Sequence, residues 1–159
     1  MEFFYPNLQN DMWRIAGLVF FAERDHFLAG KRFDRERIAA FCAARGIALG
    51  DTAAAVVRHA GNASDALLEV VEPLDLAALL ALIPSCRHIV ATGQKATDTL
   101  LEIVGDGGLP PPVGGSVEVV FAGREVTLWR MPSSSRAYPL PLDKKADAYR
   151  RMFAAAGIL

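Results

Sequence analysis

Residues 130–151, RMPSSSRAYPLPLDKKADAYRR, form the stretch from which the fold of this chain is best predicted. They follow an apolar run, residues 125–129, that is typical of a strand, and they lead into a helix expected from Asp143. The three prolines between these elements remove backbone donors and fix φ, so the segment continues neither a strand nor a helix. It is therefore predicted to be a loop at the end of a strand, which is where open α/β sheets place ligands.

The loop combines three serines with Arg130, Arg136 and Tyr138. Phosphate oxygens suit this set, because hydroxyls donate single hydrogen bonds and a guanidinium donates a fork. Residues 124–151 hold seven Lys/Arg against three Asp/Glu, so they carry +4 in a chain of net charge −1. An anion-facing surface and a solvated helix fit this asymmetry equally well, and an ordinary strand-to-helix connection is the alternative for the loop.

Composition predicts one globular domain over residues 1–159, with 52% hydrophobic and 22% charged residues. The net charge of −1 argues against a protein that coats nucleic acid indiscriminately. Cys42 and Cys86 cannot supply a four-cysteine zinc or iron–sulfur site, and they favour a reducing, cytoplasmic compartment. No apolar run has the length of a membrane span and no basic segment precedes an apolar core, so neither a transmembrane helix nor a signal peptide is expected.

Apolar periodicity, caps and breakers predict the secondary structure. The predicted helices are residues 12–20 (capped by Asn10 or Asp11), 35–45, 64–71 (capped by Ser64 or Asp65), 75–83, 95–104 and 143–156. The predicted strands are residues 47–49, 88–91, 116–121 and 124–129, the last two forming a hairpin. Residues 22–33 and 105–115 are expected to be loops, and residues 52–62 a loop with possible helical turns. This order predicts an α/β fold, a three-layer α/β/α arrangement with a small, mostly parallel central sheet flanked by helices.

No motif typical of nucleotide or metal chemistry is present: there is no P-loop, no GxGxxG after a strand and no HExxH. The three histidines are too scattered to suggest a metal site. Several polar positions follow predicted strands or begin predicted helices. Since the carboxyl ends of parallel strands meet at one edge of a sheet, a cleft bordered by Asn10, Asp51, Gly93 and Ser133 is expected.

The chain resembles the uracil-DNA glycosylase superfamily, in particular the mismatch-specific uracil and hypoxanthine-DNA glycosylase branches. Residues 5–13, YPNLQNDMW, are similar to an aromatic–x–x–Pro–x–Asn–x–Phe–Trp signature, with Leu8 at the proline position. Gly46-Ile47 with Asp51 is similar to the family's second strand, and residues 92–96, TGQKA, to its glycine-containing turn. Residues 131–136, MPSSSR, resemble the Pro-Ser loop that enters DNA, with Met131 where His or Asn is usual.

The resemblance implies a monofunctional DNA glycosylase, an N-glycosyl hydrolase of DNA repair that flips out and excises uracil or hypoxanthine without metal or organic cofactor. Its partner would be DNA containing a damaged or mismatched base. The implied site residues are a catalytic Asn10, which orients water or donates to the leaving base; base-binding Tyr5, Met131 and Asp51; and DNA-binding Ser133, Ser134, Ser135, Arg136, Gly93 and Lys95.

The family carries a first strand and a first catalytic motif upstream of the aromatic signature, whereas Met1 stands only four residues before Tyr5. A late start codon, a truncation or a degenerate member of the family is the expected explanation. The alternatives are an inactive member that binds nucleic acid or a free base, and a structural α/β domain. Asn10 also suits a helix cap, Tyr5 suits packing on Trp13, and Lys95, Lys144 and Lys145 suit solvent-facing positions.

Overall fold

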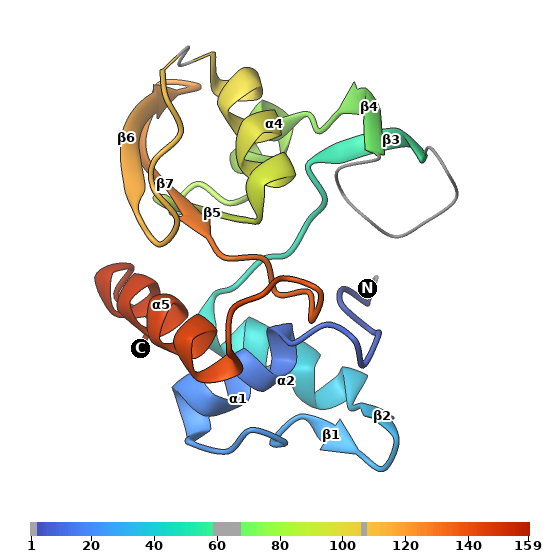
Figure 1. The fold of residues 1–159 in the computed structure, drawn as a ribbon. Helices are drawn as coiled ribbons and strands as arrows, with labels where there is room; N and C mark the ends of the chain where they lie inside the picture. Colours follow the sequence, from blue (N-terminus) through green and yellow to red (C-terminus); the bar gives the residue numbers. More distant parts are fainter. Residues whose placement is uncertain (1–2, 59–67, 106–107) are drawn as a thin grey trace. The chain divides into compact units, whose positions relative to one another are not determined.

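The computed structural model describes residues 3–58, 68–105 and 108–159, and it divides the chain into two compact units (Figure 1). Unit 1 comprises Met1–Gly50 and Pro132–Leu159, and unit 2 comprises Asp51–Met131. Within the described residues there are five helices and seven strands, so the expected mixture of helices and strands is confirmed. That the chain forms a single domain stays a prediction.

Unit 1 is mainly helical. It contains the helices α1 (Met12–Phe21), α2 (Arg35–Arg45) and α5 (Leu142–Ala155), together with the two-residue strands β1 (Leu28–Ala29) and β2 (Arg32–Phe33). The helices α1 and α5 pack against each other. The segment between α1 and α2 was expected to be a loop, and it instead forms a short antiparallel hairpin in which Leu28 pairs with Phe33.

Aromatic side chains fill much of the interior of unit 1. The Phe20 ring lies 4.9 Å from both the Phe41 and the Phe153 ring, and Phe27 is almost fully buried. Gly17 of α1 leaves room for the backbone carbonyl of Glu23, against which a Cβ would collide. These contacts join α1, α2 and α5 in one aromatic core.

Unit 2 is built on a three-stranded sheet of order β5-β7-β6, formed by β5 (His88–Thr92), β7 (Arg124–Met131) and β6 (Ser116–Phe121). β5 and β7 are parallel, and β6 and β7 form the predicted antiparallel hairpin. Ala122 and Gly123 both have positive φ, as a two-residue hairpin turn requires. The sheet is therefore mixed rather than mostly parallel.

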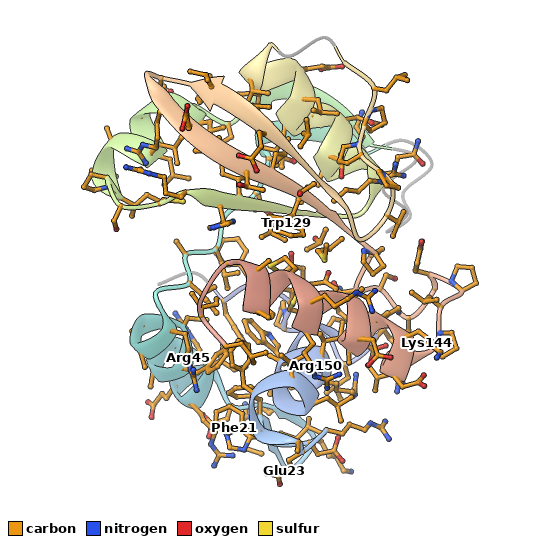
Figure 2. The ribbon with its side chains drawn as sticks, turned by 90° about the vertical axis from the view of Figure 1, so that its left-hand side faces the viewer. Phe21, Glu23, Arg45, Trp129, Lys144 and Arg150 are labelled. Carbon is orange, nitrogen blue, oxygen red and sulfur yellow. The ribbon has the colours of Figure 1, made fainter. Side chains whose placement is uncertain are left out.

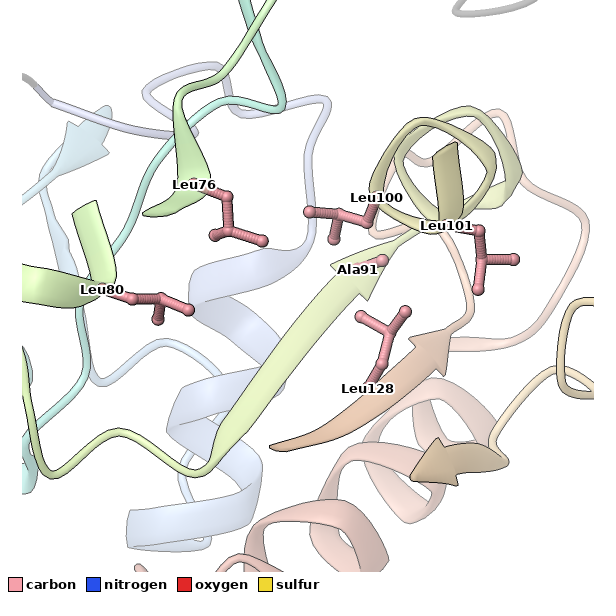
Figure 3. Close-up of a cluster of buried hydrophobic side chains, with 6 residues drawn as sticks. All are labelled: Leu76, Leu80, Ala91, Leu100, Leu101 and Leu128. Carbon is pink, nitrogen blue, oxygen red and sulfur yellow. The ribbon is translucent and has the colours of Figure 1, made fainter. Parts of the chain in front are cut away.

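The core of unit 2 is a cluster of buried aliphatic side chains that joins this sheet to α3 (Leu76–Leu82) and α4 (Gln94–Val104) (Figure 3). Its members are Leu76, Leu80, Ala91, Leu100, Leu101 and Leu128. The Arg124 guanidinium donates to the carbonyl oxygens of Leu80 and Ile83, at 3.0 Å each, and so satisfies the C-terminal end of α3.

Three predictions about the middle of the chain are wrong. Residues 47–49 form no strand; the Ile47 amide instead donates to the Cys42 carbonyl and helps to end α2. Residues 53–58 and 68–73, expected as loop and helix, are the antiparallel strands β3 (Ala53–Arg58) and β4 (Leu68–Pro73). Their valine pairs favour strands over helices. The predicted helix cap at Ser64 or Asp65 lies outside the described residues.

The remaining elements follow the prediction to within one or two residues. Asp34 accepts a hydrogen bond from the Arg37 amide at the start of α2, and Asp75 does the same for the Ala78 amide at the start of α3. β7 extends to Met131, two residues beyond the predicted end, and α5 begins at Leu142. No helix in the described ranges is long and apolar enough to cross a membrane.

Candidate functional site

The segment before α1 and the loop before α5 lie side by side in unit 1, although more than a hundred residues separate them. Asn10 and Ser135 form an antiparallel β-bridge. The Asp11 amide donates to the Ser134 carbonyl at 2.7 Å, and the Arg136 amide donates to the Gln9 carbonyl at 2.9 Å. Two of the segments on which the family resemblance rests are thus joined by backbone hydrogen bonds.

Asn10 turns the chain into α1. Its Oδ1 accepts a hydrogen bond from the Met12 amide at 2.9 Å, two residues ahead, as in an Asx turn. Asn7 makes the equivalent bond to the Gln9 amide at 2.8 Å. Among the described residues, none accepts a hydrogen bond from the Asn10 side-chain amide, so its NH₂ group is available to another acceptor.

The Asp11 carboxylate is a buried hub for three cations. Arg14 Nη1 lies 3.0 Å and Arg136 Nε 3.3 Å from Oδ1, and Lys145 Nζ lies 3.7 Å from Oδ2. Arg14 Nη1 also reaches the carbonyl oxygens of Leu8 and Asn10, at 2.9 and 3.3 Å. One carboxylate thereby ties α1, α5 and the Pro-Ser loop to one another.

Lys145 corrects a prediction, because it is 1% exposed instead of facing solvent. Its Nζ donates to the Ser135 carbonyl at 2.8 Å and lies 5.9 Å from the centre of the Tyr138 ring. Its neighbour Lys144 is exposed, as expected (Figure 2). The buried ammonium group therefore holds the backbone of the Pro-Ser loop in place.

The serines and Arg136 keep unused donors. The Ser133 hydroxyl accepts from the Ser135 amide, and the Ser135 hydroxyl accepts from the Ala137 amide, each at 3.2 Å. Arg136 uses its Nε toward Asp11, and among the described residues no group accepts from its two Nη atoms. Its side chain is 43% exposed. The Ser134 residue, by contrast, is buried and contributes its carbonyl.

The ring of Tyr5 meets the ring of Trp13 edge-on, with 6.3 Å between the two ring centres. Trp13 Nε1 donates to the Phe4 carbonyl at 3.1 Å, which fixes the N-terminal segment to α1.

Tyr149 of α5 donates its hydroxyl to the Pro132 carbonyl at 2.9 Å. Burial, and secondarily the charge of Tyr5, raises the pKa of Tyr149 well above its usual value.

The other candidate residues belong to unit 2. Gly93 has φ 96°, and its amide donates to the Met131 carbonyl at 3.0 Å, which joins the end of β5 to the end of β7. Met131 is fully buried, so its side chain offers no exposed surface for a base. Lys95 is half-buried in the first turn of α4, and Asp51 is exposed. The expected cleft that also includes Asn10 and Ser133 stays a prediction.

Sequence reasoning missed the buried cluster of Asp11, Arg14 and Lys145. A signal for Lys145 was present, because Lys145, Tyr149 and Met152 recur at helical i, i+4, i+7 spacing and so share one face of α5. No comparable local signal marks Arg14. Among the described residues, no group of three or more His, Cys, Asp or Glu is placed to hold a metal ion.

Unit 1 is also the basic part of the chain. It contains 12 Lys/Arg against 8 Asp/Glu, a formal charge of +4, whereas unit 2 contains 5 against 10, a formal charge of −5. A basic unit with an exposed guanidinium and half-buried hydroxyl donors can attract and hold a phosphate group. Comparison with protein-family models, with curated proteins and with solved structures found no significant match to the chain.

Proposed function

We propose that the chain is a DNA glycosylase that excises a deaminated base, uracil or hypoxanthine. The observation that supports the proposal is the β-bridge between Asn10 and Ser135, because it brings the Asn10 side-chain amide beside a loop that carries serine hydroxyls and the Arg136 guanidinium. The proposal includes a three-layer α/β/α arrangement of the uracil-DNA glycosylase type.

In the proposed reaction the damaged base leaves the stack, at a cost of roughly a few kcal/mol, and the N-glycosidic bond is hydrolysed. The free NH₂ group of Asn10 donates to the leaving base, or holds the water that attacks the sugar cation. Tyr5 stacks on the flipped base. Ser133, Ser135 and Arg136 hold the DNA backbone with their unused donors.

A second candidate is a protein that binds nucleic acid or a free base without cleaving it. Two observations favour it: Asn10 Oδ1 is already engaged by the Met12 amide, and Met131 is buried where the family usually places His or Asn. Basic unit 1 would then supply binding alone. The two candidates differ in whether a base is released.

A single-turnover excision assay separates them. Duplex and single-stranded oligonucleotides carrying uracil or hypoxanthine are incubated with excess protein and release of the base is measured. Asn10→Ala is expected to lower the rate at least about a hundredfold, in line with the loss of one positioned catalytic group, while DNA affinity stays nearly unchanged.

The matched control is Asn7→Ala, which removes the same kind of Asx turn three residues earlier. It should excise as fast as the unaltered chain. Equal loss in both variants would assign Asn10 a purely structural role. Binding without release of any base in the unaltered protein would favour the second candidate.

Arg136 is tested by the salt dependence of DNA binding. Arg136→Gln should weaken binding and reduce the slope of log K against log salt by about one, because one phosphate contact is lost. An unchanged slope would place Arg136 away from the DNA.

A further inference from the structure

The charge cluster around Asp11 is unbalanced. Asp11 is one carboxylate, and Arg14, Lys145 and Arg136 are three cations that face it within 3.0–3.7 Å. The four side chains therefore carry a formal charge of +2. Lys145 Nζ also lies over the ring of Tyr138, 5.9 Å from its centre.

Three of the four charged side chains are buried. The side chains of Asp11, Arg14 and Lys145 are 8%, 7% and 1% exposed. Arg14 Nε is buried and has no hydrogen-bond partner among the described residues. Buried cations are costly unless they are paired, and here one carboxylate pairs with all three, so the cluster carries an excess of positive charge that favours an anion.

Arg136 provides access to the cluster from solvent. Its side chain is 43% exposed, and no group in the described part of the chain accepts a hydrogen bond from its Nη atoms or from the hydroxyls of Ser133 and Ser135. Asp11 accepts a hydrogen bond from Arg136 Nε and so orients the guanidinium. Its two Nη atoms can then donate to a pair of acceptor oxygens in the same plane.

We propose that this cluster binds a dianionic phosphate group, a phosphate monoester or free phosphate, in preference to a phosphodiester. The residual charge of +2 matches a monoester, which carries close to two negative charges at neutral pH, whereas each backbone phosphodiester carries one. The inference rests on the proposed function only in taking a nucleic-acid strand end as the source of the monoester.

Calorimetric titration of the full chain with inorganic phosphate and with dimethyl phosphate tests the charge preference. At about pH 8, where phosphate is a dianion, phosphate should bind at least about tenfold more tightly than the monoanionic diester. Equal affinity for the two, or binding of neither, would overturn the proposal.

Variants separate electrostatic recognition from a structural role. Lys145→Met removes one buried charge and keeps a long apolar side chain, so the preference for phosphate over dimethyl phosphate should shrink at least about threefold. Arg136→Gln should abolish measurable phosphate binding, while Arg136→Lys should restore part of it. Lys144→Gln, the exposed neighbour, should change nothing.

An unchanged preference in a folded Lys145→Met would contradict the proposal. If Lys145→Met does not fold, Arg136→Gln decides, because its partly exposed side chain can be replaced without opening the core; unaltered phosphate binding in that variant would overturn the site.

Two oligonucleotides of the same sequence, one with a terminal phosphate and one with a terminal hydroxyl, identify the source. Tighter binding of the phosphorylated strand assigns the site to a strand end, and equal binding alongside a preference for inorganic phosphate assigns it to free phosphate. Base excision with no preference for phosphate would refute this site and leave the glycosylase proposal standing. A preference for phosphate without base excision would support this site and contradict the glycosylase proposal.

Discussion

The core cluster of unit 2 consists of leucine and alanine side chains, whereas unit 1 buries a carboxylate, a guanidinium and an ammonium group beside its aromatic rings. The two units also carry opposite formal charges, +4 in unit 1 and −5 in unit 2. Buried charge contributes little to stability compared with apolar packing, and proteins depart from an apolar interior mainly at functional sites. The contrast is therefore one of interior chemistry: unit 1 buries charged groups beside aromatic rings, whereas the core cluster of unit 2 is aliphatic.

The largest expected effect concerns the Asp11 hub. Asp11→Asn keeps the shape of the side chain but leaves Arg14 and Lys145 facing a neutral group, so unfolding should become easier by about 3–5 kcal/mol. The control is Asp147→Asn, since Asp147 forms an i,i+3 pair with Arg150 at 2.9 Å on the exposed face of α5. Its loss should change stability by about 0.5 kcal/mol or less.

Urea denaturation of both variants measures the difference. A similar, small change in the two would mean that the buried charges of unit 1 are not essential to its packing, and the contrast between the units would lose its meaning.

The second prediction addresses the apolar core of unit 2. Leu128→Ala in β7 removes a fully buried side chain from the leucine cluster and should cost about 2–5 kcal/mol. Val120→Ala in β6 alters the same sheet at a residue that is 71% exposed, and should cost about 0.5 kcal/mol or less. Thermal unfolding of the two variants compares them. Equal melting temperatures would show that the cluster does not hold unit 2 together.

A smaller effect is expected at Tyr149 in unit 1. Tyr149→Phe loses the hydrogen bond to the Pro132 carbonyl and should cost about 1 kcal/mol at neutral pH. Burial and Tyr5 raise the pKa of Tyr149, so its stabilising contribution is fully present below about pH 10, the unfolded value, and is lost as pH rises above it.

The variant should therefore show a shallower fall in stability above about pH 10 than the unaltered chain, measured by urea midpoints across the alkaline range. Tyr138→Phe, which keeps a ring near Lys145, serves as the control and should retain the steep fall. Parallel alkaline curves for all three proteins would remove Tyr149 as the cause.

The smallest expected effect is a difference in chemical reactivity between the two cysteines, one of which lies in each unit. Burial raises the pKa of Cys42 in α2, whereas Cys86 of unit 2 is only half-buried. A thiol reagent should label Cys86 first, since reactivity follows exposure and thiolate content. Repeating the labelling in increasing urea shows whether the two units open together or separately. Faster labelling of Cys42 would contradict the burial described for unit 1.

Elements whose signals lie within a few neighbouring residues could be predicted from the sequence. Asp34 and Gly46 bracket α2, and Ala122-Gly123 marks the β6–β7 turn, because each fixes its own backbone locally. The strands β3 and β4 could not be predicted in the same way. Their pairing joins residues 53–58 to residues 68–73, and nothing within either segment alone specifies that partner.

In the candidate site too, some features could be predicted from short segments of sequence and others depend on contacts between distant segments. The resemblance led to Asn10 and to the Ser133–Arg136 loop, and their adjacency is a property that the structure adds. The burial of Arg14 and Lys145 depends on packing of α1 against α5, which no short motif encodes. A charged residue placed on an apolar helical face, as Lys145 is, is the one local hint of such a cluster.

Unit 1 is assembled from two stretches of chain that leave the ribosome at different times. α1 and α2 are synthesised first, and their partner α5 arrives only after all of unit 2. Unit 2 is continuous in sequence, so its sheet can form as soon as Met131 has left the ribosome. At that stage α5 has not yet been synthesised, and the aromatic faces of α1 and α2 are not yet packed against it. Apolar surface that is exposed during synthesis favours aggregation, and the Asp11 cluster is completed only when Arg136 and Lys145 have been synthesised.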